Sequence, residues 1–348
     1  MTDTTKFNLK DDLYNIPGDT GYPWRLKKFV EYQHKVPPIH PLTLDEYFNR
    51  HEEELTDDDY IWICWILSLS YNEITTLFIW RHLKDKFGNL GDVPNEYYDE
   101  FWNENRDTMP WGTARKYVKA NNQFSQLMLD FRDLTNNKPH QWLIDVSTSS
   151  DPEENYRIIE KKLRNVNNCG RFSVDLFFEE LIFVNNKKNC YNIQESNEFD
   201  WKHCANLTSG LFNIMYADTK AQDYDKRKRI DTKDKEILTN MLLEVQKTIK
   251  ETYPEQDSRI PVVVGKVCSF RNLFKSARYA GFHHDRQLGI IYKYKENYPD
   301  NPLWDECFEI RKSRFSENLL GEVGGWTGIR KERKKLFLTK GLTGAEDL

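Results

Sequence analysis

Hydrophobic and polar positions follow helical rather than strand spacing along most of this chain. Between residues 43 and 54, Leu44, Tyr47 and Phe48 recur at intervals of three and four, which predicts an amphipathic helix. The next segment, Asp58–Ser70, is apolar on nearly every side, as expected of a helix at the centre of a bundle. Further helices are predicted over Ile74–Phe87, Pro94–Trp102, Trp111–Leu134, Tyr156–Val166, Ser173–Phe183, Asp200–Tyr216, Asp231–Thr252, Gln287–Glu296 and Leu303–Asn318. The sequence therefore predicts a mainly α fold, a helical bundle.

Two regions depart from this periodicity. Residues 260–270 are rich in β-branched side chains, and together with residues 278–282 they predict a small β-hairpin. Residues 1–43 are rich in Pro, Gly, His and Tyr, which predicts an N-terminal arm. We therefore expect four regions: the arm over 1–43, a helical core over 44–218, a polar helical connection over 219–259, and a hairpin with helices over 260–348. The last region is expected to complete a functional site with the core.

Composition narrows the class of protein. The 348 residues are 39% hydrophobic and 14% aromatic, enough apolar surface for one large core or two smaller ones. A net charge of −5 argues against a strongly basic protein that coats nucleic acid but leaves room for a local basic groove. Six cysteines without C-x-x-C spacing give no signal for structural zinc or a disulfide framework. With no apolar leader and no apolar stretch long enough to span a bilayer, a cytoplasmic protein without a membrane partner is expected.

The densest chemistry lies between residues 268 and 287, where three Arg, two His, an Asp and a Gln are interleaved with aromatics. Because unpaired charge is costly to bury, this segment predicts a functional site rather than core. His283 and His284 are adjacent, and on a strand they would point to opposite faces, so they could not easily share one metal ion. No metal is expected.

A second candidate site lies at a turn between two predicted helices. Leu163 and Val166 lead through Gly170 into the next helix, a pattern similar to the hairpin of helix-hairpin-helix DNA glycosylases. Backbone N–H groups at such a turn and at the following helix start can hold a DNA phosphate. An ordinary turn with Gly170 at the helix stop explains the same residues, and the two interpretations stay open.

A third candidate is the predicted helix over residues 111–134. Arg115, Lys119 and Asn122 fall on one of its faces and could follow DNA phosphates, while Val118 and Phe124 pack inward. A solvated amphipathic face accounts for the same pattern.

Taken together, successive blocks of the chain resemble the bacteriophage amino acid:DNA transferase family, in order from about residue 58 to 325. The blocks are Tyr60–Leu83, Arg115–Phe124, Gly170–Ser173, Arg278–Gln287, and Leu303–Asp305 continuing through Arg311 to Glu322. The family is itself similar to the helix-hairpin-helix DNA glycosylase superfamily. The resemblance therefore implies that fold, with DNA binding and catalysis in the core over 44–218 and the site completed by residues 260–348.

The resemblance also implies an activity, a step of thymidine hypermodification that protects viral DNA from host restriction. Such a transferase attaches an amino acid, glycine or similar, through its amine to phosphorylated 5-hydroxymethyluracil in DNA and displaces the phosphate. The implied partners are double-stranded phage DNA carrying that base, a free amino acid, and a separate DNA base kinase that acts first in the host cytoplasm. The base must leave the duplex. No cofactor is required, since the phosphorylated base already stores the driving force.

Residue roles follow from that chemistry. A departing phosphate needs cations, and Arg171, Arg278 and Arg286 can supply guanidinium groups. The attacking amine needs a base, for which Asp285 or Glu322 is expected, with His284 as an alternative acid or base. The implied DNA and phosphate contacts are Gly170, Arg171, Ser173, Arg115, Lys119 and Asn122.

One block departs from the family pattern. The run Asn206–Leu211 stands where the family tends to have a Ser-Cys-Arg-Asn-Gly-Leu-like sequence, and it lacks the Arg. If this region contacts the amino acid carboxylate, the identity of that amino acid is in doubt.

The alternative function is a helix-hairpin-helix base-excision glycosylase with Asp200 as its catalytic carboxylate. Asp200 lies farther past Gly170 than that motif places its Asp, and the hairpin contains no Lys. A noncatalytic DNA-binding or structural phage protein is a third interpretation, and it leaves the Asp285–Gln287 segment without a role.

Overall fold

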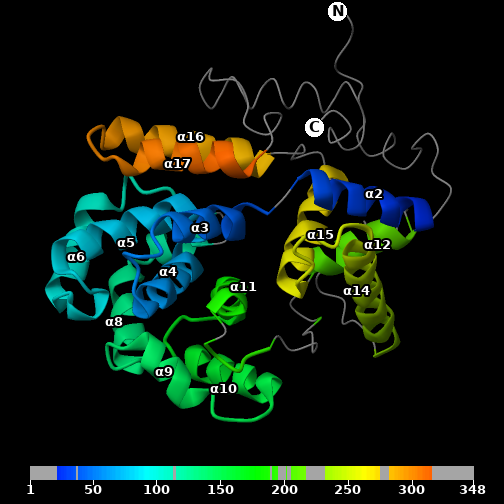
Figure 1. The fold of residues 1–348 in the computed structure, drawn as a ribbon, viewed down its shortest axis with the longest axis horizontal. Helices are drawn as coiled ribbons and strands as arrows, with labels where there is room; N and C mark the ends of the chain where they lie inside the picture. The colour runs from blue at the N-terminus through cyan, green and yellow to red at the C-terminus, as the bar shows by residue number, and fades with distance from the viewer. Residues whose placement is uncertain are drawn as a thin grey trace, which may run out of the picture. The chain divides into compact units, whose positions relative to one another are not determined.

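The computed structural model describes residues 22–36, 38–112, 115–188, 190–194, 201, 205–216, 232–274 and 282–315. These residues are mainly helical and contain no β-strand, which confirms the predicted α class (Figure 1). The chain divides into two compact units, and each is built from separate stretches of sequence. Unit 1 comprises residues 1–38, 198–289 and 315–348, and unit 2 comprises residues 39–197 and 290–314. Among the described helices, none is long and apolar enough to cross a membrane.

Unit 2 contains most of the described helices. In chain order they are α3 (Ile39–Arg50), α4 (Asp57–Ser70), α5 (Glu73–Phe87), the 3₁₀ turn η2 (Leu90–Asp92), α6 (Asn95–Asn105), α7 (Lys116–Ala120), α8 (Phe124–Leu134), α9 (Pro139–Val146), α10 (Pro152–Arg164), α11 (Arg171–Lys188) and α17 (Leu303–Arg314). Helix α16 (Phe282–Asn297) begins in unit 1 and ends in unit 2.

Helix α4 lies at the centre of unit 2, as its apolar sequence predicts. It packs against α5, α9 and α11, and every residue from 59 to 70 is buried. Thr56 and Asp59 form a capping box at its start, and Tyr71 ends it in the left-handed conformation with φ 47°. On its core side Trp65 stacks on Phe131 of α8 with ring centroids 4.3 Å apart.

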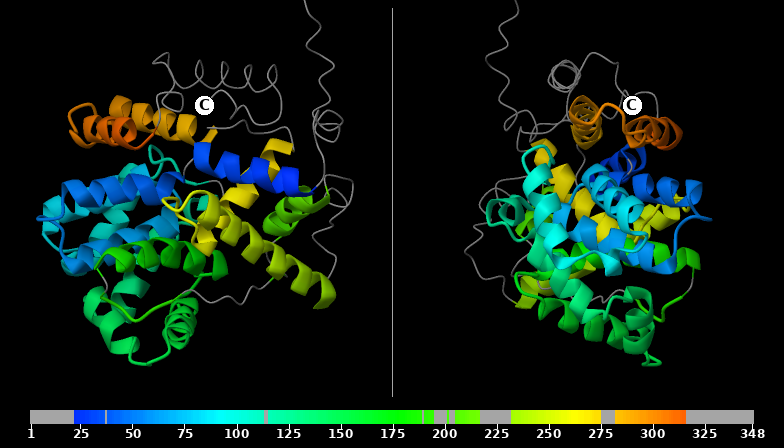
Figure 2. Two further views of the ribbon diagram at one scale, coloured as in Figure 1. Left: turned by 45° about the vertical axis from the view of Figure 1, so that its right-hand side comes forward. Right: turned by 90° about the vertical axis from the view of Figure 1, so that its left-hand side faces the viewer.

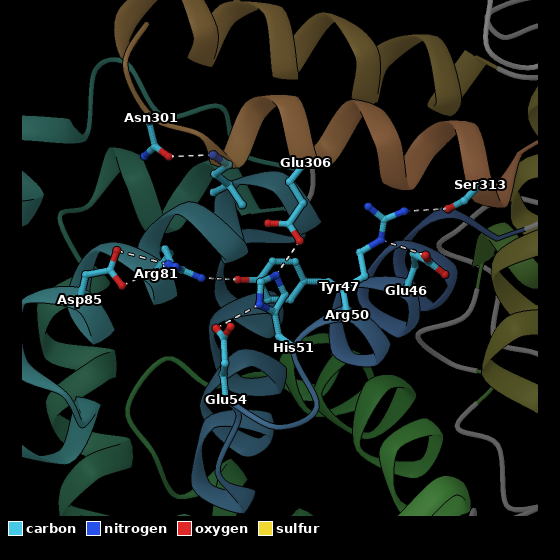
Figure 3. Close-up of polar contacts among 11 residues, drawn as sticks. Glu46, Tyr47, Arg50, His51, Glu54, Arg81, Asp85, Asn301, Glu306 and Ser313 are labelled. Atoms are coloured by element: carbon cyan, nitrogen blue, oxygen red, sulfur yellow. Dashed lines mark hydrogen bonds and ion pairs between the residues drawn. The ribbon is translucent and has the colours of Figure 1, made fainter.

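Polar contacts hold α17 on α3, although more than 250 residues separate His51 from Glu306. Figure 3 shows His51, just after α3, between Glu54 and Glu306. His51 Nδ1 lies 3.1 Å from Glu54 Oε2, and His51 Nε2 lies 2.5 Å from Oε1 of Glu306, which is on α17. Arg50 Nη2 lies 3.5 Å from the Ser313 hydroxyl of α17. A segment from near the end of the described chain thus completes unit 2.

The described helices of unit 1 are α2 (Tyr22–Lys35), α12 (Ala205–Tyr216), α14 (Thr232–Thr252), α15 (Ile260–Phe274) and the beginning of α16 (Figure 2). Helix α12 packs against α2, α14 and α15. The α12 and α15 backbones approach closely at Gly210, where a Cβ atom would lie 2.5 Å from the Val267 carbonyl oxygen. Arg25 of α2 donates to the Ile214 carbonyl at 2.8 Å.

The predicted β-hairpin is wrong for its first segment, because residues 260–274 form α15. Ile260, Val263, Val267 and Phe270 recur at helical spacing and are all buried in one core cluster. Burial on that face outweighs the strand preference of β-branched side chains, which depends on context. Residues 278–281 of the second segment lie outside the described residues, and Phe282 begins a helix.

The expected region boundaries also differ from the two units. Part of the expected arm is helical, since α2 and the first residues of α3 lie within residues 1–43. The expected polar connection contains α14, whose Leu238, Leu242 and Val245 are fully buried in the core of unit 1. The expected single helix over residues 111–134 is two helices, α7 and α8, separated by Asn122 with φ 52°.

Candidate nucleic-acid interface

The connection between α10 and α11 is a tight hairpin over residues 165–170. Asn168 adopts φ 60°, and the Cys169 N–H donates to the Val166 carbonyl at 3.1 Å. Gly170 directly precedes α11, and its carbonyl accepts the Ser173 N–H at 2.9 Å. Gly170 therefore lies at a helix start and not at the helix stop that the ordinary-turn interpretation expected, and phosphate binding at this turn stays a prediction.

Backbone donors and open space meet at this helix start. The first N–H groups of an α-helix have no intrahelical acceptor, and they carry a positive partial charge. Helix α11 is 18 residues long. A Cβ atom built on Gly170 would meet no other atom within 4 Å. There is thus open space beside Gly170 in the direction of its missing side chain.

Basic side chains surround the hairpin. Lys161, Lys162 and Arg164 lie in the last turn of α10 and are exposed. Burial raises the pKa of the Cys169 thiol to about 11, while the positive charges of Arg115 and Arg164 oppose that rise. Both guanidinium groups therefore act at the hairpin, and the thiol stays protonated at neutral pH, which excludes it as a thiolate nucleophile.

An exposed aromatic ring stands at the same helix start. Phe172 is 42% exposed, although it is a large apolar side chain. The Tyr71 ring meets it edge-on at 5.4 Å, with an interplanar angle of 83°. The Arg115 guanidinium lies over it, 4.9 Å from the ring centroid. We call Phe172, Tyr71 and Arg115 the Phe172 platform.

The structure changes the role expected of Arg115. Its side chain is only 2% exposed and packs against the Phe172 ring instead of lying on a solvated face that follows phosphates. Val118 and Phe124 are fully buried, as predicted. Arg115 is thus part of an aromatic platform, which the helical periodicity of its neighbours did not indicate.

The three residues expected on one helix face do not lie on one helix, because α7 spans only Lys116–Ala120. Asn122 lies beyond the end of α7, and its Oδ1 accepts from Trp102 Nε1 at 3.0 Å and from Arg106 Nη1 at 2.9 Å. Burial lowers the pKa of Lys119. The Asp107 carboxylate opposes this shift, and the charges of Lys293 and Arg106 add to it. Asn122 is occupied within the fold, whereas contact of Lys119 with phosphate stays a prediction.

Ser173 also differs from expectation. Its side chain is 2% exposed and hydrogen-bonds with the Cys169 thiol. The hydroxyl therefore stabilises the hairpin from inside and does not point towards a ligand. Arg171 begins α11, and its side chain lies outside what the structure describes.

The expected catalytic residues fall in unit 1, where the described part of the chain contains only some of them. His284 and Arg286 lie on α16, so His283 and His284 are on a helix and not on a strand. His284 is 1% exposed and meets Phe315 edge-on at 4.6 Å, whereas Arg286 is partly exposed. The Asp285 side chain, Arg278, Glu322 and the alternative carboxylate Asp200 lie outside the described residues.

A buried lysine in unit 1 was not singled out by the sequence patterns. Lys266 of α15 is 6% exposed, and burial lowers its pKa from 10.5 to about 7. The signal was available, because a lone Lys interrupts the apolar run from Val262 to Val267. Within the described ranges, no group of three or more His, Cys, Asp or Glu side chains is placed to hold a metal ion.

Comparisons with protein-family models, with curated proteins and with solved structures found no match.

Proposed function

We propose that this chain binds the DNA backbone at the α10–α11 hairpin and modifies a base of that DNA. The observation that carries the proposal is the start of α11, where Gly170 leaves open space beside the first turn of the helix, and the N–H groups of a first turn carry a positive partial charge. Exposed Lys161, Lys162 and Arg164 add positive charge at the same end of α10. Helix starts flanked by cations are favourable sites for phosphate groups.

The reaction we propose is the one that the family resemblance implies. The amine nitrogen of an amino acid forms a bond to the methylene carbon of phosphorylated 5-hydroxymethyluracil. The bond between that carbon and the phosphate oxygen breaks, the phosphate leaves with the electron pair, and the amine loses a proton. Arg286 is partly exposed on α16, and the proposal gives its guanidinium a contact with the departing phosphate, which guanidinium groups bind in a bidentate manner. Asp285 or Glu322 is the proposed base, with His284 as the alternative.

The substrate state tests this proposal. The protein is incubated with DNA containing thymine, 5-hydroxymethyluracil or its phosphorylated form, together with each amino acid in turn, and nucleosides are identified by mass spectrometry. We expect amino acid adducts only on the phosphorylated base. Release of free base would support the glycosylase instead, and transfer to the unphosphorylated base would contradict the proposed activation step.

Arg286→Ala is the matching variant for this assay. Removing one charge-assisted contact to the departing phosphate is expected to lower turnover by a factor on the order of 100 or more. Glu296→Ala, an exposed substitution on the same helix, is the control and should keep normal turnover. Near-normal turnover of a folded Arg286→Ala variant would remove Arg286 from the mechanism.

DNA affinity is expected to depend on salt through the end of α10. Each phosphate contact contributes a slope of about −0.9 to the plot of log affinity against log salt for duplex DNA. Replacing Lys161, Lys162 and Arg164 together with alanine should therefore flatten that slope by up to about 3. Fluorescence anisotropy of a labelled duplex between about 50 and about 200 mM salt measures it. An unchanged slope would show that these side chains do not contact phosphates, and Lys250→Ala on α14 serves as an exposed-lysine control.

A further inference from the structure

We propose that the Phe172 platform stacks against a DNA base that has left the duplex. This inference rests on the proposed function, because it needs DNA at the hairpin. It adds a contact for the base itself, whereas the hairpin accounts only for the backbone.

The position of Phe172 links it to the phosphate site. Phe172 lies two residues after Gly170 in the first turn of α11, a rise of about 3 Å along the helix. Phe172 is 42% exposed at the candidate phosphate site, so its ring is accessible to a ligand there. A nucleotide whose phosphate sits at the helix start would therefore bring its base within reach of the ring.

The ring is held in place by its neighbours. Tyr71 packs against its edge, and Tyr71 is itself fixed as the left-handed cap of α4, with its N–H bonded to the Leu67 carbonyl at 2.7 Å. The Gly112 N–H donates to the Ser70 carbonyl at 2.8 Å, and a Cβ atom at Gly112 would lie 2.5 Å from the Tyr71 carbonyl oxygen. The backbone behind the platform is closely packed, so binding of a ligand should cost little conformational entropy of the platform.

The chemistry of the platform favours a nucleobase over an apolar protein surface. Aromatic side chains stack on every base because each base has a π face, and a guanidinium adds a cation–π contribution. Arg115 is buried against Phe172, so its guanidinium makes this contribution to the ring itself and helps to hold it for the base. The surrounding cations, Lys161, Lys162 and Arg164, complement the charge of a phosphate backbone. A base rotated out of the duplex loses its own stacking partners, and the platform would replace one of them.

Fluorescence of 2-aminopurine tests the platform in the full chain. A duplex carries 2-aminopurine beside phosphorylated 5-hydroxymethyluracil, and protein is added until the DNA is fully bound. The unaltered chain should raise the fluorescence, since the neighbouring base loses a stacking partner when the target leaves. Phe172→Ala should lower the ratio of extrahelical to stacked base by a factor on the order of 10 or more.

Further variants separate stacking from apolar bulk. Phe172→Leu should fail like Phe172→Ala, whereas Phe172→Trp should keep the fluorescence rise. Ile144→Ala removes a side chain of nearly equal exposure, 41%, and should change nothing. If circular dichroism shows that Phe172→Ala is unfolded, the Leu and Trp variants decide the question.

The outcomes distinguish this inference from the proposed function. A normal fluorescence rise with Phe172→Leu, on DNA that is still bound, would overturn the platform and leave the proposed function standing. Failure of the unaltered chain to bind the duplex at all would overturn both.

Discussion

Replacing Lys266 with methionine is expected to raise the free energy of unfolding by roughly 4 kcal/mol at neutral pH. Lys266 is 6% exposed, and burial lowers its pKa from 10.5 to about 7. Each unit of pKa shift corresponds to about 1.4 kcal/mol between the two protonation states. Methionine retains an unbranched apolar side chain at this position and removes the charge.

The sign of the pH dependence follows from proton binding. Between about pH 7 and 10.5 the unfolded chain binds a proton at Lys266 that the folded chain releases, so this group makes stability rise with pH. Below about pH 7 the buried charge destabilises the folded protein fully, and this destabilisation disappears as the pH approaches 10.5. The advantage of the methionine variant should therefore be largest below neutral pH and disappear towards pH 10.5.

Urea denaturation of both proteins across this pH range measures the difference. The other titratable groups are common to both proteins, so their effects cancel in the comparison. Lys250→Met on α14 is the matched control, since Lys250 is exposed and surface substitutions usually change stability by less than about 0.5 kcal/mol. A Lys266→Met variant whose stability gain is the same at every pH would contradict the buried-charge explanation.

Helical periodicity predicted the helices that pack around a single apolar face or are buried on all sides. Asp58–Ser70 was predicted from sequence and α4 spans Asp57–Ser70, because a run with almost no polar positions has no stable alternative outside the core. The same reasoning failed for residues 260–270, where a run of β-branched residues is compatible with either a strand or a buried helix. Tertiary packing decides between strand and helix in such cases, and sequence periodicity alone does not show which side chains that packing buries.

Long-range assembly was also beyond the sequence. Unit 1 and unit 2 each join segments distant in the chain, and nothing local to α2 or α17 shows which helices they meet. For the turn at Gly170, the sequence left open a phosphate-holding hairpin and an ordinary turn with the glycine at a helix stop. A glycine between two helices does not show on which side of the turn it lies, and the structure places it before α11. Phe172 contacts Tyr71, about 100 residues away in the sequence, and Arg115 is buried against the Phe172 ring. Only the fold brings these residues together.

Trp65→Ala is expected to destabilise unit 2 by about 3–5 kcal/mol, the cost of emptying a large buried site. Trp65 is fully buried on α4, stacks on Phe131 at 4.3 Å and meets Phe177 of α11 edge-on at 6.3 Å. Alanine would leave a cavity lined by α4, α8 and α11, which cannot close without moving three helices. Denaturation with urea, followed by circular dichroism, gives the loss.

A smaller substitution isolates the cavity from the chemistry of the indole. The Trp65 Nε1 atom is buried and has no hydrogen-bond partner in the described structure, so phenylalanine removes an uncompensated polar group together with part of the ring. Trp65→Phe should therefore cost less than half as much as Trp65→Ala, because the remaining ring still contacts Phe131. If both variants lost the same free energy of unfolding, the cavity left by alanine would not be the cause of the destabilisation.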